Sequence, residues 1–387
     1  MSEEVPDGGF DPPPKPWSRT RRRHLAGVLL LPSLLLLRWM SAEAPQAVED
    51  IYSQAVFPTV QSVLSTVASW LPFSAGEAMT ALLSIGLIAW MVRVVRTVRR
   101  ATQGRRALLL GATCDALGFA GVLYAAFLLA WGLNFSRVSL PQHLELDQRP
   151  AEVEELVALV RELVEASNRY RADLPENDAG TLLIEGGTDT VFAELQRLHA
   201  TVGDTFPQYA GTRLTPRVPM LSSVLSNAGI SGIYWPFTGE MHVNGQLPAS
   251  SLPFVACHEA AHAWGVPRED EANLVAAMVC GRSASPLFRY SGAVTSLTYA
   301  GNALSSADAE RARELLSRLS PAVLRDRENV RLFWTNARGV LSPVARASND
   351  AYLKSQGQAL GARSYGAVVD LLVAERRRAQ RRDRRGR

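Results

Sequence analysis

The chain has 387 residues, of which 47% are hydrophobic, and its formal net charge is only +4. This length allows one sizeable soluble domain together with membrane segments, and the near-balanced charge gives no functional signal by itself. The three cysteines, Cys114, Cys257 and Cys280, are too few and too irregularly spaced to form a disulfide framework or a zinc ribbon.

Three apolar stretches in the first third predict transmembrane helices, at about 25–40, 75–92 and 107–133. Each is near or above the length that a helix needs to cross a bilayer. The first stretch follows a basic segment and could instead be a signal peptide, but Ala42-Glu43-Ala44 is the only candidate cleavage site. We therefore expect a retained helix. Asp115, in the third stretch, is expected to face another helix or the cytoplasmic end, because a carboxylate is costly in lipid.

The distribution of arginines predicts how these helices are oriented. Arginines cluster at 19–23 and 93–106, whereas residues 41–77 contain no lysine or arginine. By the positive-inside rule, the N-terminus and the second loop lie in the cytoplasm, and everything after about residue 134 lies outside. We expect a multi-pass protein of the cell membrane with an extracytoplasmic domain.

We accordingly divide the chain into a membrane part at 1–134, an extracytoplasmic domain at 135–375 and a basic tail at 376–387. The tail could lie against anionic headgroups or wall polymers, or it could be a disordered solubilising end.

The outer domain is expected to be mostly α (α+β). Apolar residues at helical spacing predict a helix over 151–172, and a second helix is expected at 189–202. Two short β-favouring pieces, at 232–235 and 240–243, flank Pro236-Phe237-Thr238-Gly239 and predict a hairpin. Helices are expected again from about residue 252.

A metal-ligating motif stands in the first of these later helices. His258 and His262 are four residues apart, so both imidazoles lie on one helix face and can reach one ion. Glu259 adjoins the first histidine, where it can contact a metal-bound water without being a ligand. The alternative is a surface helix with two solvated histidines, but the flanking residues are apolar. We expect a zinc ion at this position.

The next helix, at 268–280, is expected to supply the third ligand. Gly265 can end the first helix in a left-handed turn. A carboxylate from a second helix is the usual completion of a site with two histidines and one glutamate, which leaves one position for water. We choose Glu269, because Asn273 on the same face could then hydrogen-bond a ligand histidine. Glu271 is the alternative, and the unused glutamate would be an ordinary acid in the first helical turn.

These motifs resemble the gluzincin branch of zinc peptidases, in which HExxH is followed by a helix bearing E-x-x-x-D. Residues 269–273, Glu-Asp-Glu-Ala-Asn, are similar to the E-x-E-A-D form of membrane-bound prenyl-protein and heat-shock proteases. Asn273 replaces the aspartate, and the gap from His262 to Glu269 is short. The resemblance implies a zincin-like helical domain.

More closely, the chain resembles an uncharacterised bacterial family of membrane-anchored, zincin-like proteins with three N-terminal helices. The shared segments are of the types GIYxPFTGE, HExxHxxGxxREDEAN, RYS and YLKxxGQ. They stand here at 232–240, 258–273, 289–291 and 352–358. This resemblance implies a bacterial cell membrane as the location.

A hydrolytic mechanism would need a base and an oxyanion stabiliser. Glu259 would take a proton from the zinc-bound water and pass it to the leaving nitrogen. The candidate oxyanion stabilisers are Tyr290, Tyr234 and His242. We place Tyr290 first because it follows the ligand helix. The hairpin precedes the HExxH helix in the order expected for a zincin edge strand, which could bind an extended peptide by strand addition.

The function expected from these residues is that of a membrane-anchored zinc metallohydrolase that cleaves peptide bonds. Its expected partners are a peptide or protein substrate of the cell envelope and the lipid bilayer, and no nucleic acid. Three alternatives stay open: a catalytically silent scaffold with structural zinc, a zinc hydrolase of a non-peptide envelope amide, and a receptor. The short cytoplasmic loop argues against the receptor, because it offers no output domain.

Overall fold

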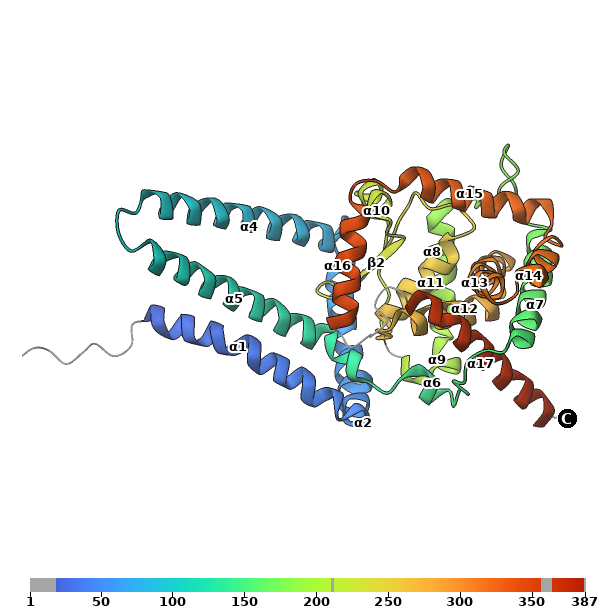
Figure 1. The fold of residues 1–387 in the computed structure, drawn as a ribbon, viewed down its shortest axis with the longest axis horizontal. Helices are drawn as coiled ribbons and strands as arrows, with labels where there is room; N and C mark the ends of the chain where they lie inside the picture. The colour runs from blue at the N-terminus through green and yellow to red at the C-terminus, as the bar shows by residue number, and fades with distance from the viewer. Residues whose placement is uncertain (1–18, 210–211, 356–363, 386–387) are drawn as a thin grey trace, which may run out of the picture. The chain divides into compact units, whose positions relative to one another are not determined.

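The computed structural model describes residues 19–209, 212–355 and 364–385 (Figure 1). The chain forms two compact units: the first comprises Met1–Met40 and Leu82–Phe127, and the second comprises Ser41–Ala81 and Leu128–Arg387. Residues 1–18, with the basic Lys15, and the last three residues of the YLKxxGQ segment, 356–358, lie outside the described residues.

The first unit is built from long apolar helices. It contains most of α1 (Arg19–Ala42), α4 (Ala75–Arg100) and α5 (Arg105–Ala130). The 26 residues of α4 and of α5 correspond to about 39 Å of helix, which exceeds the roughly 30 Å of a bilayer's hydrocarbon core. Both are apolar enough to span a membrane, and almost none of their most apolar residues are buried. Within this unit α1 approaches α5, because a Cβ on Gly121 would lie 3.0 Å from Leu30.

Of the three expected spanning helices, two are long and apolar enough among the described residues, α4 and α5. For α1, the part whose side chains are described forms a shorter apolar helix, Leu29–Ala42, so its expected crossing stays a prediction. The third predicted stretch also ends earlier than residue 133. Helix α5 stops at Ala130, and a short 3₁₀ helix, η2 (Gly132–Ser136), follows in the second unit.

The second unit is mostly helical with one small sheet. Its elements before the sheet are α2 (Pro45–Ala47), the π-helix η1 (Val48–Val56), α3 (Phe57–Ser69), α6 (Leu140–His143), α7 (Val153–Arg171), α8 (Gly187–Ala200), α9 (Val202–Thr205) and the 3₁₀ helix η3 (Pro207–Tyr209). The strands are β1 (Pro216–Arg217), β2 (Gly232–Trp235) and β3 (Glu240–Val243), with α10 (Ser222–Ala228) between β1 and β2. The helices that follow are α11 (Leu252–Ala263), α12 (Glu269–Arg282), α13 (Pro286–Ala307), α14 (Ala309–Leu316), α15 (Pro321–Ala337), α16 (Ser342–Ser355) and α17 (Ser364–Arg385). The predicted helices at 151–172, 189–202 and 268–280 are thus confirmed as α7, α8 and α12.

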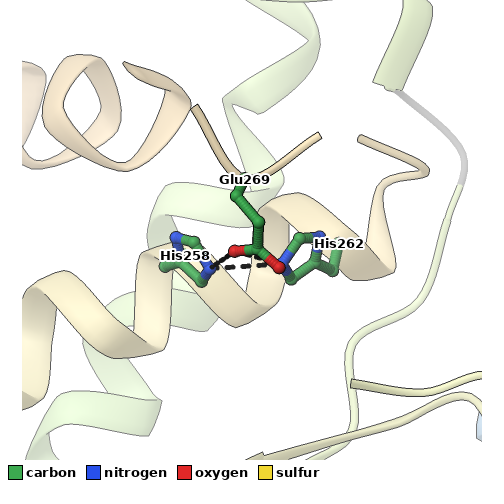
Figure 2. A group of neighbouring side chains, drawn as sticks. All are labelled: His258, His262 and Glu269. Atoms are coloured by element: carbon green, nitrogen blue, oxygen red, sulfur yellow. Dashed lines mark hydrogen bonds and ion pairs between the residues drawn. The ribbon is translucent and has the colours of Figure 1, made fainter. Parts of the chain in front are cut away.

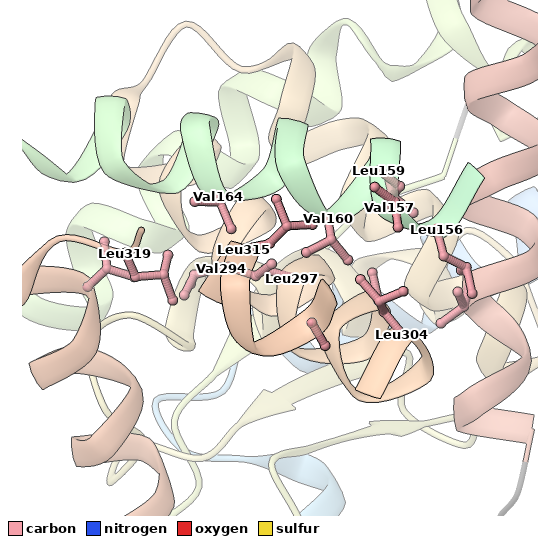
Figure 3. Packing of buried hydrophobic residues seen from close by; sticks show 14 of the residues in the cluster. Leu156, Val157, Leu159, Val160, Val164, Val294, Leu297, Leu304, Leu315 and Leu319 are labelled. Atoms are coloured by element: carbon pink, nitrogen blue, oxygen red, sulfur yellow. The ribbon is translucent and has the colours of Figure 1, made fainter. Parts of the chain in front are cut away.

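The main hydrophobic core lies where α7 packs along α13 (Figure 3). Val160 and Val164 of α7 and Leu297 and Leu304 of α13 are all 3% exposed or less. Apolar residues at spacings of three and four place these side chains on one face of each helix. Burial of each such side chain contributes roughly 1.5–3 kcal/mol, so this packing holds α13 in place. Helices α11 and α12 pack against α13.

The sheet has the strand order β1-β3-β2. Strand β2 pairs antiparallel with β3, from Gly232 opposite Val243 to Trp235 opposite Glu240, which confirms the predicted hairpin. Strand β1 pairs parallel with β3 and has no counterpart among the sequence predictions. Strand β2 therefore lies at an edge of the sheet.

The predicted basic tail begins inside α17. Arg376 forms an ion pair with Glu162 of α7, with a nitrogen–oxygen distance of 2.7 Å. Arg377 pairs with Glu155 at 2.5 Å and also donates to the backbone oxygen of Asp147. The boundary expected at residue 375 is therefore corrected: the first arginines of the predicted tail hold α17 against α7.

Candidate metal centre

Helix α11 presents two histidines on one face, as its four-residue spacing predicts (Figure 2). The Nε2 atoms of His258 and His262 are 3.1 Å apart, and their ring centroids are 4.7 Å apart. The apolar flanks of the motif bury this helix, so the two imidazoles lie in a largely enclosed place and not on an open surface. The expectation that one ion could contact both rings agrees with this geometry.

Glu269 is the carboxylate that reaches the histidines. Its Oε2 atom lies 3.2 Å from Nε2 of His258 and 3.7 Å from Nε2 of His262. Glu271, the alternative third ligand, instead forms an ion pair with Arg268 at 3.0 Å. Of the two glutamates that the sequence left open, the structure brings Glu269 to the histidines.

The three donor atoms fit a small divalent ion. Ligand atoms about 2.0–2.2 Å from a tetrahedral zinc ion lie about 3.4 Å from one another. The observed triangle has edges of 3.1, 3.2 and 3.7 Å, so little movement would seat an ion. Among the described residues, His258, His262 and Glu269 form the group of histidine, cysteine and acidic side chains that could hold a metal.

The orientation of His262 is set by the chain just after α11. Its Nδ1 lies 2.8 Å from the backbone oxygen of Val266. That oxygen can only accept, so Nδ1 carries the proton, and in the neutral ring the Nε2 lone pair points into the donor triangle. Asn273, which we expected to orient a ligand histidine, does not do so in the structure, and its buried Nδ2 has no hydrogen-bond partner among the residues that the structure describes. The Val266 carbonyl takes the role expected of Asn273.

Glu259 is buried beside the donor triangle and is not part of it. The residue is 3% exposed, and its Oε2 atom has no hydrogen-bond partner in the described part of the chain. Burial raises the pKa of Glu259 to about 7. A cation held by the neighbouring donors would lower this pKa and favour the ionised form.

Burial also acts on the pKa of Glu269, but here the neighbouring side chains have the larger effect. Burial favours the neutral form, but without a metal the His258 and His262 rings can act as hydrogen-bond donors to Glu269, which favours the ionised form and holds the pKa of Glu269 well below its usual value. A carboxylate that stays ionised is the form that ligates a metal.

Tyr290, our first choice of oxyanion stabiliser, is not available for that role. The residue is completely buried in the core between α7 and α13. Its hydroxyl donates to Asp326 at 2.7 Å, and Asp326 also accepts from Arg171 at 2.6 Å. The assignment of Tyr290 as catalytic is therefore corrected: it belongs to a buried polar network that supports the core.

The other two candidates are also engaged. The Tyr234 hydroxyl donates a hydrogen bond to Oε1 of Gln61 at 2.5 Å, and His242 Nε2 lies 2.8 Å from Oγ of Ser74.

A tyrosine that sequence reasoning missed, Tyr299 of α13, is only partly buried. Burial and then the charge of Glu269 raise the pKa of Tyr299 to about 12, so this ring lies within electrostatic reach of the donor triangle. No spacing rule relates residue 299 to the HExxH motif.

Two further side chains hold the turn after α11. Gly265 has a φ of +85°, which confirms the left-handed helix end that the sequence predicted. The Trp131 indole donates to the backbone oxygen of His262 at 2.9 Å. Arg137 donates to the backbone oxygen of Gly265 at 3.0 Å and is paired with the buried Glu49 at 2.6 Å. These contacts direct the chain so that α12 begins beside the histidines.

The Glu49–Arg137 pair predicts how stability depends on pH. Burial raises the pKa of Glu49, but hydrogen bonds from His143 and Arg137 outweigh it and lower the pKa from 4.5 to about 2. A lowered pKa in the folded state means that the stabilisation is fully present above pH 4.5 and is lost as the pH falls towards 2. Glu49→Gln should therefore destabilise the protein by about 1.5–3 kcal/mol at neutral pH, with a smaller difference in acid.

Denaturant unfolding of both proteins in detergent, at several pH values between neutrality and acid, measures this difference. Glu162→Gln, which breaks the surface pair with Arg376, is the control and should have little effect at any pH. A difference between wild type and Glu49→Gln that is constant with pH would contradict the role given to the ionised carboxylate.

Comparison with known protein families assigns the chain to one of them. Residues 52–373 match the family described as "Protein of unknown function (DUF3810)", and the chain belongs to this family. No curated protein matches the chain. No solved structure matches it either.

Proposed function

We propose that the protein is a membrane-anchored zinc metallohydrolase that cleaves peptide bonds. The observation that carries this proposal is the triangle of His258, His262 and Glu269 donor atoms next to a buried carboxylate oxygen of Glu259 that has no partner among the described residues. A buried polar atom without a partner costs free energy, so its retention favours a role that a bound water or substrate completes.

Zinc at this site would act as a Lewis acid and lower the pKa of a coordinated water towards neutrality. His258, His262 and Glu269 would hold it. Glu259 would accept a proton on its free Oε2 atom and return that proton to the leaving nitrogen. A pKa near 7 before a cation binds, and lower afterwards, suits a carboxylate that must first take and then release a proton.

An extended peptide is the proposed substrate because an edge strand adjoins Glu259. Gly232, the first residue of β2, is so close that a Cβ there would lie 2.4 Å from Oε1 of Glu259. The free edge of a strand can add an extended segment through backbone hydrogen bonds. The relation to gluzincins stays part of this proposal, because it rests on the HExxH resemblance and on the position of Glu269.

Membrane anchoring is proposed for α4 and α5, the two helices with sufficient length and apolar composition. Arginines 93–106 mark the loop between them as cytoplasmic by the positive-inside rule. The beginning of α4 and the end of α5 would then face the outside, and so would the second unit. This orientation places the metal centre in the cell envelope.

Substitution of Gly232 by alanine tests the function without removing a ligand. The new Cβ would push the Glu259 carboxylate from its position. We expect zinc content to stay at one ion per chain, while turnover of a peptide library falls by about tenfold to a hundredfold, because displacement of a catalytic group by about 1 Å can cost that much.

Gly281→Ala is the matched control. A Cβ at Gly281, in α12, meets nothing within 4 Å, so zinc content and turnover should match those of the wild type. Wild-type protein that is purified in detergent and binds no zinc would contradict the proposed function. Equal turnover in Gly232→Ala and wild type would contradict the role of Glu259.

A further inference from the structure

Helix α3 presents an apolar outer face, although part of the face that it buries is polar. It buries Phe57 and Ala68 together with the polar Gln61 and Ser65, which are both 0% exposed. The side chains that it presents outward include Val63 and Val67, which are 57% and 50% exposed. A surface helix in water normally buries its apolar face and exposes its polar face. Exposed valines on the outer face, with polar side chains buried on the inner face, favour an outer face that does not meet water.

Hydrogen bonds prevent α3 from turning its polar face outward. Gln61 Nε2 donates to the backbone oxygens of Arg213 and Gly239, at 3.1 and 3.0 Å. Ser65 Oγ lies 2.6 Å from Oγ1 of Thr215. Rotation of the helix would leave these buried polar groups without partners, so the valines are held outward by the fold.

The exposed apolar area continues beyond α3. Trp70 and Phe73, in the connection from α3 to α4, are 76% and 48% exposed. Met220 and Leu221, which are 87% and 56% exposed, come close to the same place, because their backbone amides donate to Glu77 in the first turn of α4. We refer to this area as the α3 surface, comprising Val56, Val63, Val67, Trp70, Phe73, Met220 and Leu221. Exposed apolar side chains that gather in one area favour an interaction site.

We propose that the α3 surface lies in the interfacial layer of a lipid bilayer. Helix α3 has no charged residue, and residues 41–77 contain no lysine or arginine. Only five residues separate α3 from α4, a candidate membrane span. The start of α4 is fixed to the second unit, because Glu240 accepts hydrogen bonds from the backbone amides of Ala75 and Gly76, at 3.1 and 2.6 Å. Tryptophan next to a span is typical of the boundary between membrane and water.

This inference rests on the proposal that α4 crosses the membrane, and it goes beyond it. A spanning helix alone would leave the second unit free to stand away from the bilayer. Contact through the α3 surface would hold that unit on the membrane, so the metal centre would act on substrates presented close to the lipid.

The test measures the surroundings of a single fluorescent label in reconstituted protein. The full chain carries Cys114→Ser, and Cys257 and Cys280, both 0% exposed, stay unlabelled. Separate variants Val63→Cys, Leu87→Cys and Leu332→Cys are labelled with an environment-sensitive dye. Leu87, in α4, reports on the span, and Leu332, in α15, is the matched exposed control at 42% exposure. Vesicles of phosphatidylcholine and phosphatidylglycerol contain doxyl-labelled phosphatidylcholine as the lipid quencher, and iodide is the aqueous quencher.

We expect the label at Val63 to be quenched by doxyl lipid and shielded from iodide several-fold relative to the label at Leu332. A label at Leu87 that is quenched by doxyl lipid, with Val63 open to iodide, would overturn the inference and leave the span intact. A label at Val63 that is shielded from both quenchers would place a protein, such as a second copy of the chain, on the α3 surface and would also overturn it. Failure of lipid to quench Leu87 would show that the proposed span itself is wrong.

Discussion

Replacement of Glu259 by glutamine is expected to slow peptide hydrolysis strongly while zinc stays bound. Glutamine has nearly the same shape, but its amide cannot accept the proton that the carboxylate is proposed to take. General base catalysis contributes roughly 10²–10⁴-fold to a rate, so turnover should fall by about that factor. The proposed ligands His258, His262 and Glu269 are unchanged, so we expect zinc content to stay at one ion per chain.

Metal analysis of the purified protein and turnover of a peptide library together measure this outcome. Loss of zinc in Glu259→Gln would show that Glu259 acts as a ligand or as a structural support. Full retention of activity would remove it from the mechanism. A wild-type protein that holds zinc but cleaves no peptide would favour a scaffold or a hydrolase of another amide.

Replacement of Glu269 by glutamine is expected to weaken zinc binding by more than about 100-fold, because mutation even of the groups that orient a ligand costs about 10–100-fold. The neutral amide oxygen would replace the one anionic donor of the triangle, and two neutral imidazoles would then hold a divalent cation. Activity should be lost together with the metal.

Glu271→Gln is the control for this substitution. Glu271 lies two residues away, but its carboxylate pairs with Arg268 and does not belong to the donor triangle. We expect zinc affinity close to that of the wild type, measured by competition with a chromophoric chelator. The reverse result, with zinc lost in Glu271→Gln and kept in Glu269→Gln, would reassign the third ligand.

Sequence patterns alone determined the parts of this protein that depend on local spacing. Two histidines four residues apart share a helix face, which allows their Nε2 atoms to lie 3.1 Å apart. The proline-containing turn at 236–239 predicted the β2–β3 hairpin, and Gly265 predicted the left-handed end of α11. Such features follow from the geometry of a few consecutive residues.

Tertiary structure decided which distant side chains meet. Glu269 and Glu271 stand in the same helical turn with equal chemistry, and only the path of the chain after Gly265 selects Glu269. Tyr290 follows the ligand helix in sequence, but the packing of α13 on α7 turns it into the core and away from solvent. The burial of polar side chains by α3 was equally hidden, because the partners of Gln61 lie about 150 or more residues away. Helical periodicity shows which residues share a face, but only packing between distant elements determines what each face contacts.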